Sequence, residues 1–360
     1  MEEKFPDSLV VLTQKQDPWR PWNYKPEDME FPCISLPENI HISTHMAIST
    51  GIQNIIKQSR NRPVIHLLES ISGLNSWLII NRCKSNYYLM VNDGGFPEVT
   101  LRPTQRLRWL LIGRHCYGVL TPGNAGRHYM MAWGFPSDRI YNSYLSIDVN
   151  KFSRFRASEQ ASRQREKIRR KLGLTSDDIL ALCVSRLLDW KRLEDLSESL
   201  VYLPESVKKK LFVLIIGNGQ FRDPINKINN IAGSRFEWIE STEYEEMVNY
   251  YAASDFFVLP SEGDIWGLVI NEALAMGKPV ICTRRIGASE LVKDGWNGFK
   301  VPVRSPQAIA DAITVLTEDQ NRRNLMAKNA TSIKDTWNSG KYINQLERIV
   351  NDIGLEEENI

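Results

Sequence analysis

The stretch of sequence that decides the fold is DFFVLPSEGDIWGLVINEALAMGKPVICT, at residues 255–283. Its first apolar run ends at Leu259 and predicts a buried strand, after which a glycine-bearing loop leads into a helix that starts near Gly267. A second apolar run, at 279–282, predicts the next strand. A strand, a loop, a helix and a strand in this order are typical of a parallel sheet, where ligands bind at the carboxyl ends of the strands.

The same alternation of strands and helices extends through the second half of the chain. It predicts strands at 179–185, 211–216, 236–239, 255–259 and 298–301, and helices at 192–202, 223–231, 244–253 and 268–276. The first half is less regular, with strands predicted at 10–13, 64–68, 87–91 and 118–121 and helices at 77–83, 105–114 and 124–133. We therefore predict an α/β fold with domains at 1–150 and 151–340 and a C-terminal helix and tail at 341–360. The polar, very basic stretch 150–172 has no apolar face and is interpreted as the interdomain linker running into a solvated helix.

The composition limits the classes of protein that need to be considered. A chain of 360 residues with 42% hydrophobic and 24% charged residues is typical of a soluble globular protein with two domains. The net charge of +2 does not indicate binding to nucleic acid. No apolar run reaches the roughly 18 residues of a membrane span, and the N-terminus does not resemble a signal peptide. The five cysteines lack the spacing of a metal site, so we expect free thiols in a cytoplasmic protein and no bound metal.

Two carboxylates flank the start of the predicted helix at Gly267. Asp264 lies in the loop, and Glu272 follows it by eight positions, about one turn into the helix. The helix start favours an anion such as a diphosphate, and ionised carboxylates accept short hydrogen bonds from the hydroxyls of a sugar. The alternative is that Asp264 only caps the helix and that Glu272 is a surface charge.

Two further motifs follow predicted strands. Arg186 and Lys191 lie in one loop after the strand at 179–185, and their positive charges suit two phosphates; the alternative is solvated surface charge. Gly217 and Gly219 flank Asn218 after the strand at 211–216, where the backbone could approach a ligand, although most such pairs are simply turns.

The order of these motifs resembles the retaining GT-B glycosyltransferases of family four. The resemblance includes the stretch IGASELVKDGWNGFKV at 286–301 and covers about residues 136–350. WGLVINE at 266–272 resembles a bacterial subgroup active on surface glycans. The resemblance implies two Rossmann-like, doubly wound domains that face each other across a cleft. It also implies transfer of a hexose, with retention of configuration, from a UDP- or GDP-sugar to a saccharide or lipid-linked saccharide, without a cofactor or a metal.

The resemblance also implies roles for single residues. Arg186 and Lys191 bind the diphosphate, Asp264 contacts the donor sugar and Glu272 holds the ribose. The family has glutamate at the first acidic position, so Asp264 is a departure that alters the sugar contact, and Glu262 replaces it only if the loop bulges by two residues. The remaining donor contacts fall on Ile265, Trp266, Gly267, Leu268, Gly217, Asn218 and Ile239, the last of which lies beside the loop that faces the base.

The N-terminal half departs from the family pattern. No glycine occurs before Gly51, so the first strand–helix unit of the domain is missing or strongly divergent. Asp93 stands in the loop where the family often has a histidine, and it is the catalytic candidate there. These departures leave a non-catalytic GT-B module or subunit, which binds a nucleotide sugar or a partner protein, as the alternative function.

The run 102–114 combines four arginines with Trp109 and leucines at helical spacing. Such a helix suits peripheral contact with an anionic membrane at its inner face, where a lipid-linked acceptor would lie. The alternative is an amphipathic core helix with a solvated basic face.

Overall fold

A computed structural model describes residues 115–353, except 146, 230, 232 and 234, and six strands of the preceding sequence. The chain divides into two compact units. The first unit contains the described residues up to Thr121, then 127–143, and the chain from Tyr342; the second contains 122–126 and 144–341.

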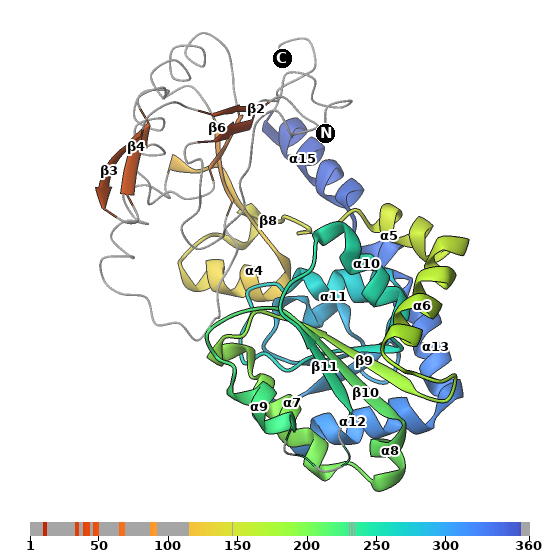
Figure 1. The fold of residues 1–360 in the computed structure, drawn as a ribbon. Helices are drawn as coiled ribbons and strands as arrows, with labels where there is room; N and C mark the ends of the chain where they lie inside the picture. The colour runs from red at the N-terminus through yellow and green to blue at the C-terminus, as the bar shows by residue number, and fades with distance from the viewer. Residues whose placement is uncertain are drawn as a thin grey trace. The chain divides into compact units, whose positions relative to one another are not determined.

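The second unit is built on one parallel sheet (Figure 1). Its strands are β9 (Ile179–Val184), β10 (Leu211–Ile216), β11 (Phe236–Ile239), β12 (Phe256–Leu259), β13 (Val280–Thr283) and β14 (Gly298–Val301). The spatial order is β11-β10-β9-β12-β13-β14. The chain therefore adds β10 and β11 on one side of β9 and then returns to place β12 on the other side of β9. The strand order reverses between β9 and β12, and this is the point at which doubly wound sheets bind ligands.

The alternation of side chains along each strand produces a core on both faces of this sheet. Leu180 and Leu182 face one core, whereas Ala181 and Cys183 face the other. Helices α5 (Val149–Arg156), α6 (Glu159–Lys171), α10 (Tyr244–Ala253) and α11 (Leu268–Ala275) cover the first face (Figure 1). Helices α7 (Leu193–Ser199), α8 (Glu205–Lys210), α9 (Asp223–Asn229) and α12 (Pro306–Glu318) cover the second. Helix α13 (Gln320–Ala330) contributes Met326 to the second core and Ala330 to the first.

The first unit contains a parallel sheet of β5 (Ile65–Leu68), β6 (Tyr87–Val91), β7 (Gly118–Thr121) and β8 (Ile140–Asn142), in that order. Strands β1 (Val10–Leu12) and β2 (Cys33–Ser35) pair in parallel, and β3 (Asn39–Ser43) and β4 (Met46–Ser49) pair antiparallel. Helix α4 (Gly123–Ala132) lies between β7 and β8 in the sequence. Helix α15 (Ser339–Ile353) packs Leu346 and Ile349 against Leu89 of β6 and Leu120 of β7. The α/β class predicted from the sequence is confirmed in both units.

The basic stretch at 150–172 differs from the prediction of a solvated linker. It forms α5 and α6, which bury Phe152 and Ala161 in the core of the second unit. Arg165 and Arg169 of α6 donate to the Asp255 carboxylate at 2.6 and 2.9 Å. The apolar pattern of the sequence did not reveal the buried face of these helices, because arginines form part of that face. These arginines pair with Asp255, which belongs to a different segment of the chain.

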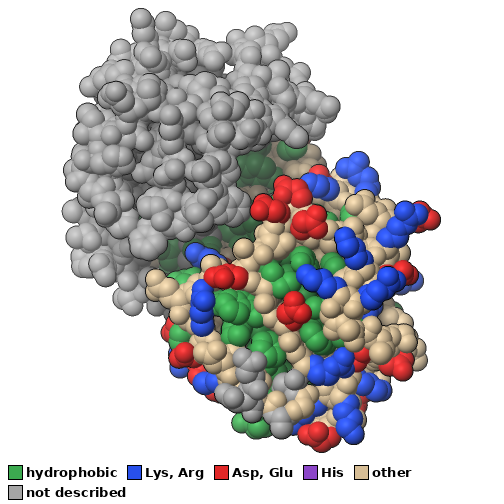
Figure 2. All heavy atoms as spheres, in the orientation of Figure 1, with side chains coloured by type: hydrophobic (Ala, Val, Ile, Leu, Met, Phe, Trp, Pro, Cys, Tyr) green, Lys and Arg blue, Asp and Glu red, His purple; other side chains and the backbone are tan. Residues whose placement is uncertain are grey.

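The surface and the thiols fit the composition. Lys and Arg side chains are interspersed with Asp and Glu over the face of the second unit that Figure 2 shows. Cys116, Cys183 and Cys282 are buried free thiols, and burial raises the pKa of each to about 12. In the described part of the chain, no helix is both long and apolar enough to span a membrane.

Candidate donor site at the switch point of the second unit

The loops that follow β9 and β12 are joined at the switch point. The Glu262 N–H and the Ser261 hydroxyl both donate to the carbonyl of Trp190, at 2.8 and 3.1 Å. Within this frame Lys191 Nζ donates to Asp264 Oδ2. Their side chains are 11% and 23% exposed, so the ion pair is shielded but still open to a ligand. Two residues predicted from separate motifs, 73 positions apart, thus form one contact.

A third loop, which follows β13, supports the Asp264 loop from the other side. Gly287 N–H donates to Asp264 O at 2.9 Å, and Ala288 N–H donates to Trp266 O at 2.7 Å. A Cβ on Gly287 would lie 2.1 Å from Ile265 O, so only glycine permits this approach. The carboxylate of Asp264 is therefore held on a backbone that two neighbouring loops fix.

Helix α11 begins as predicted, immediately after Gly267. This glycine has a left-handed φ of 89°, and a Cβ on it would lie 2.9 Å from Ile286 Cγ2. No side chain caps the helix, so the interpretation of Asp264 as a helix cap is wrong. Ile270 N–H donates to Gly267 O at 2.9 Å, and the N–H groups of Leu268 and Val269, which precede it, are available to an anion.

Glu272 lies in the second turn of α11 and is buried, with 7% of its surface exposed. The interpretation of Glu272 as a surface charge is therefore wrong. The Tyr251 hydroxyl of α10 donates to its Oε2 at 2.7 Å. Burial raises the pKa of Glu272 to about 7, against the opposing effect of that hydrogen bond. A carboxyl held in this way has one oxygen fixed by the protein and can change its charge near neutral pH.

The other predicted donor contacts of the α11 loop divide into core and surface residues. The Trp266 ring is buried, stacks on Trp337 with centroids 4.7 Å apart, and donates from Nε1 to Asn271 Oδ1 at 2.9 Å. Only its backbone is therefore available to a ligand, as was predicted for the amides. The side chains of Ile265 and Leu268 are exposed.

Gly217 and Gly219 are needed for close packing of the turn that follows β10. A Cβ on Gly217 would lie 1.9 Å from Ser185 O, and one on Gly219 would lie 2.2 Å from Leu187 O. Their positive φ values, 146° and 157°, also favour glycine. The motif thus lets the turn after β10 pack against the loop that carries Arg186, while contact of Gly217 and Asn218 with a donor stays a prediction.

Of the four remaining residues singled out from the sequence, three lie in the described part of the chain. Arg186 is exposed, and its guanidinium has no partner among the described residues. Ile239 is half-buried at the end of β11, where its carbonyl accepts from Gly217 N–H at 2.9 Å. Glu262 forms an ion pair with Arg304 at 2.9 Å. It therefore does not take the place of Asp264, which pairs with Lys191. Asp93 lies outside the described residues, as does the predicted membrane helix at 102–114.

The sequence analysis missed Tyr251, the hydrogen-bond partner of Glu272. A signal was present, because a tyrosine in the buried half of a helix needs a partner for its hydroxyl. Nothing in the local sequence, however, places α10 beside α11, so the partner could not be named.

Comparisons with known proteins find similarity to glycosyltransferases in sequence and in fold. Residues 164–333 match the family model described as "Glycosyl transferases group 1". N-acetyl-alpha-D-glucosaminyl L-malate synthase of Bacillus anthracis is 26% identical over 55% of this chain and 51% of its own. A D-inositol 3-phosphate glycosyltransferase of Corynebacterium urealyticum is 38% identical over 29% of this chain and 25% of its own. The chain spans about half the length of most of the curated relatives it matches.

The fold extends the likeness to almost the whole chain. The structure of Anabaena HepE in complex with UDP-glucose has a TM-score of 0.73 at 18% identity and covers 98% of this chain and 93% of its own. WaaG, a glycosyltransferase involved in lipopolysaccharide biosynthesis, has a TM-score of 0.60 at 17% identity, covering 84% and 82%. The chain has the GT-B fold, as the resemblance implied, and residues 164–333 within it are similar to glycosyltransferases.

Proposed function

We propose that this chain transfers a hexose from a nucleoside-diphosphate sugar to a saccharide or lipid-linked saccharide, with retention of configuration. The observation that carries the proposal is the Lys191–Asp264 ion pair at the switch point. A cation for phosphate and a carboxylate for hydroxyl groups touch each other there. A ligand that uses both must carry its phosphates next to its hydroxyl groups, as a nucleotide sugar does.

The chemistry follows from where charge develops. The bond between sugar C1 and the diphosphate oxygen breaks, C1 bonds to the acceptor hydroxyl, and the hydroxyl proton passes to the departing diphosphate. Lys191, Arg186 and the first N–H groups of α11 stabilise the charge on the leaving group. Asp264 orients the sugar through its hydroxyls, and Glu272 holds the ribose. Attack from the face that the diphosphate leaves gives retention.

UDP is the first choice of donor nucleotide, because the similar Anabaena HepE structures were solved with UDP and UDP-glucose. The similarity to WaaG, a glycosyltransferase involved in lipopolysaccharide biosynthesis, supports a surface glycan as the acceptor. Peripheral contact with the inner face of a membrane fits such an acceptor and stays a prediction.

The test begins with binding and ends with turnover. The full chain is screened by thermal shift against UDP, GDP and their sugars, since a ligand that binds the folded state raises the melting temperature. Release of UDP from the best donor is then measured with and without glycan acceptors, using wild type and Lys191→Met. We expect turnover that Lys191→Met abolishes.

Two other outcomes are informative. Tight binding of a nucleotide sugar without hydrolysis or transfer to any acceptor would favour the non-catalytic module. The absence of binding to every nucleotide would overturn the donor site itself.

A further inference from the structure

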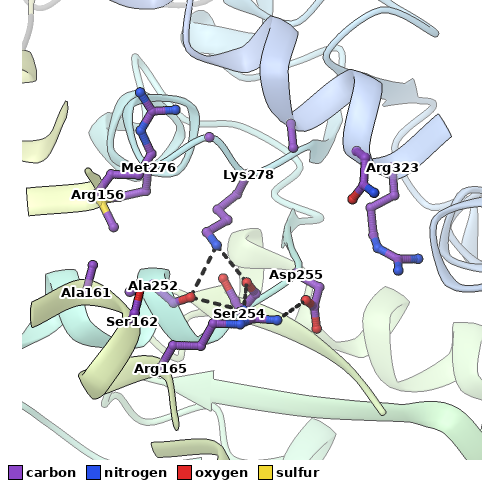
Figure 3. Close-up of a pocket in the computed structure, with 13 residues that line it drawn as sticks. Arg156, Ala161, Ser162, Arg165, Ala252, Ser254, Asp255, Met276, Lys278 and Arg323 are labelled. Atoms are coloured by element: carbon purple, nitrogen blue, oxygen red, sulfur yellow. Dashed lines mark hydrogen bonds and ion pairs between the residues drawn. The ribbon is translucent and has the colours of Figure 1, made fainter. Parts of the chain in front are cut away.

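A cavity of about 280 Å³ lies in the second unit (Figure 3). It lies at the end of the sheet opposite the donor loops. Asp255 and Lys278, which line it, directly precede β12 and the Pro279 that leads into β13. The donor residues follow the other ends of the strands. The cavity is therefore separate from the site where we place the nucleotide sugar, and it does not depend on the proposed function.

Positive charge predominates in this cavity. Four of its lining residues are cationic and one is acidic: Arg156, Arg165, Lys278 and Arg323, against Asp255. The acid is already paired, because Arg165 and Arg169 donate to its two oxygens. Arg156, Lys278 and Arg323 have no ion-pair partner in the part of the chain that the structure describes.

Some of this charge has a structural role. Lys278 Nζ donates to Ser254 O at 2.7 Å and to Ala252 O at 3.3 Å, and Arg165 Nη1 contacts the same carbonyls, so both cap the C-terminal end of α10 (Figure 3). Arg323 Nη1 donates to Leu316 O at 2.6 Å at the end of α12.

Capping leaves several donors unused. The Arg156 guanidinium makes no hydrogen bond with any described residue, and Nη2 of Arg323 has no acceptor there. Burial lowers the pKa of Arg323 and lowers that of Lys278 to about 7, because the neighbouring arginines add to the cost of its charge. An anion between these groups would offset that cost.

We propose that this cavity binds a phosphate group, as inorganic phosphate or as the monoester of a small sugar. Arg156 supplies a planar N–H fork that matches phosphate oxygens, and Lys278 and Arg323 add positive charge to the wall of the cavity. Ser162 and Asn324 add polar groups to the wall. Water occupies about 30 Å³ per molecule in the liquid, so the cavity holds more than a phosphate and has room for an organic portion.

The experiment measures phosphate binding by calorimetry to the full chain. Inorganic phosphate and a hexose monophosphate are titrated separately at constant ionic strength, in a Lys191→Met background that weakens the donor site. Arg156→Gln is the test variant, because this side chain has no partner whose loss would perturb the fold. Arg154→Gln, on the same helix but outside the cavity, is the matched control. Lys278→Met removes a second cation and keeps an apolar stem.

We expect saturable binding that Arg156→Gln and Lys278→Met each weaken by at least about tenfold, and that Arg154→Gln leaves unchanged. Tighter binding of the hexose monophosphate would identify an organic phosphate as the occupant, and equal affinities would identify inorganic phosphate. The proposal is overturned if the background protein binds neither probe. It is also overturned if Arg156→Gln binds as well as Arg154→Gln while both have the same melting temperature.

Discussion

Folding favours the neutral form of the Glu272 carboxyl group, whereas ligand binding favours its ionised form. Burial raises its pKa from 4.5 to about 7 in the folded chain. Between those two values the folded state binds more protons than the unfolded state, so this group makes the protein less stable as pH rises through that window. A ribose diol prefers the ionised form, because a carboxylate accepts stronger hydrogen bonds than a carboxylic acid does. Tyr251 stabilises the ionised form in part and keeps its geometry fixed.

Glu272→Gln is therefore expected to weaken UDP binding and to stabilise the protein at the same time. At pH 8 we expect affinity for UDP to fall about tenfold, the loss of one charge-assisted pair, while the melting temperature rises above that of wild type. At pH 5.5, where the wild-type group is neutral in the folded chain, the affinity difference should nearly vanish and the difference in melting temperature should be smaller than at pH 8, because the unfolded carboxyl is still mostly ionised there. Calorimetry and thermal unfolding at the two pH values test this. Wild-type affinity for UDP in the variant at pH 8 would remove Glu272 from the ribose site.

Asp264 makes a different prediction, because we place it against the sugar and not against the nucleotide. Asp264→Asn should leave UDP affinity within about twofold and weaken the intact UDP-sugar by about tenfold, since a neutral amide accepts weaker hydrogen bonds. The variant also releases Lys191 from its ion pair, so affinity for UDP alone should not fall. Lys191→Met is the comparison and should weaken both ligands. Equal losses for UDP and UDP-sugar in Asp264→Asn would contradict the assignment.

At the scale of elements, continuous apolar runs were enough to predict most strands of the second unit. The predicted bounds of β10, β11 and β14 agree with the structure: β10 is a continuous apolar run, and β11 and β14 are short segments rich in aromatic and β-branched residues. The failures have a common cause. Helices α5 and α6 pack through arginines that pair with Asp255, and Tyr251 contacts Glu272 across two helices. Such pairs depend on which elements become neighbours, and a local pattern does not contain that information.

The turn after β10 tests whether the donor loops depend on backbone packing. In Gly217→Ala the new Cβ would lie 1.9 Å from a backbone oxygen of the loop that carries Arg186. We expect a loss of more than about 3 kcal/mol in the free energy of unfolding, together with weaker UDP binding. Gly173→Ala is the matched control, because its φ is also positive, at 67°, but nothing lies within 4 Å of a Cβ there. That variant should lose only about 1–2 kcal/mol and bind UDP normally. Chemical denaturation and calorimetry compare the two variants, and equal losses would mean that strain, not loop contact, explains the glycine.

At the scale of the whole molecule, the two units are not two consecutive halves of the sequence. The last helix, α15, follows the whole second unit in the chain, yet Leu346 and Ile349 belong to a core with strands β6 and β7 of the first. The sequence predicted a C-terminal helix and tail at 341–360 but not the partner of the helix, because its apolar stripe fits any apolar surface. The described residues that we assign to the donor all lie in the second unit. Stability of the first unit and nucleotide affinity should therefore be separable.

Ile349→Ala tests that separation. The side chain is fully buried, so its truncation leaves a cavity and should lower the stability of the first unit by about 2–5 kcal/mol. Affinity for UDP should stay within twofold of wild type, because no predicted nucleotide contact lies in that core. Asn351→Ala, an exposed position on the same helix, controls for changes to α15 itself. Differential scanning calorimetry with and without UDP separates the two effects: UDP should shift the melting of the second unit equally in all three proteins. If Ile349→Ala weakened UDP binding as much as it lowered stability, the donor site would depend on the first unit, and the second unit alone could not explain nucleotide binding.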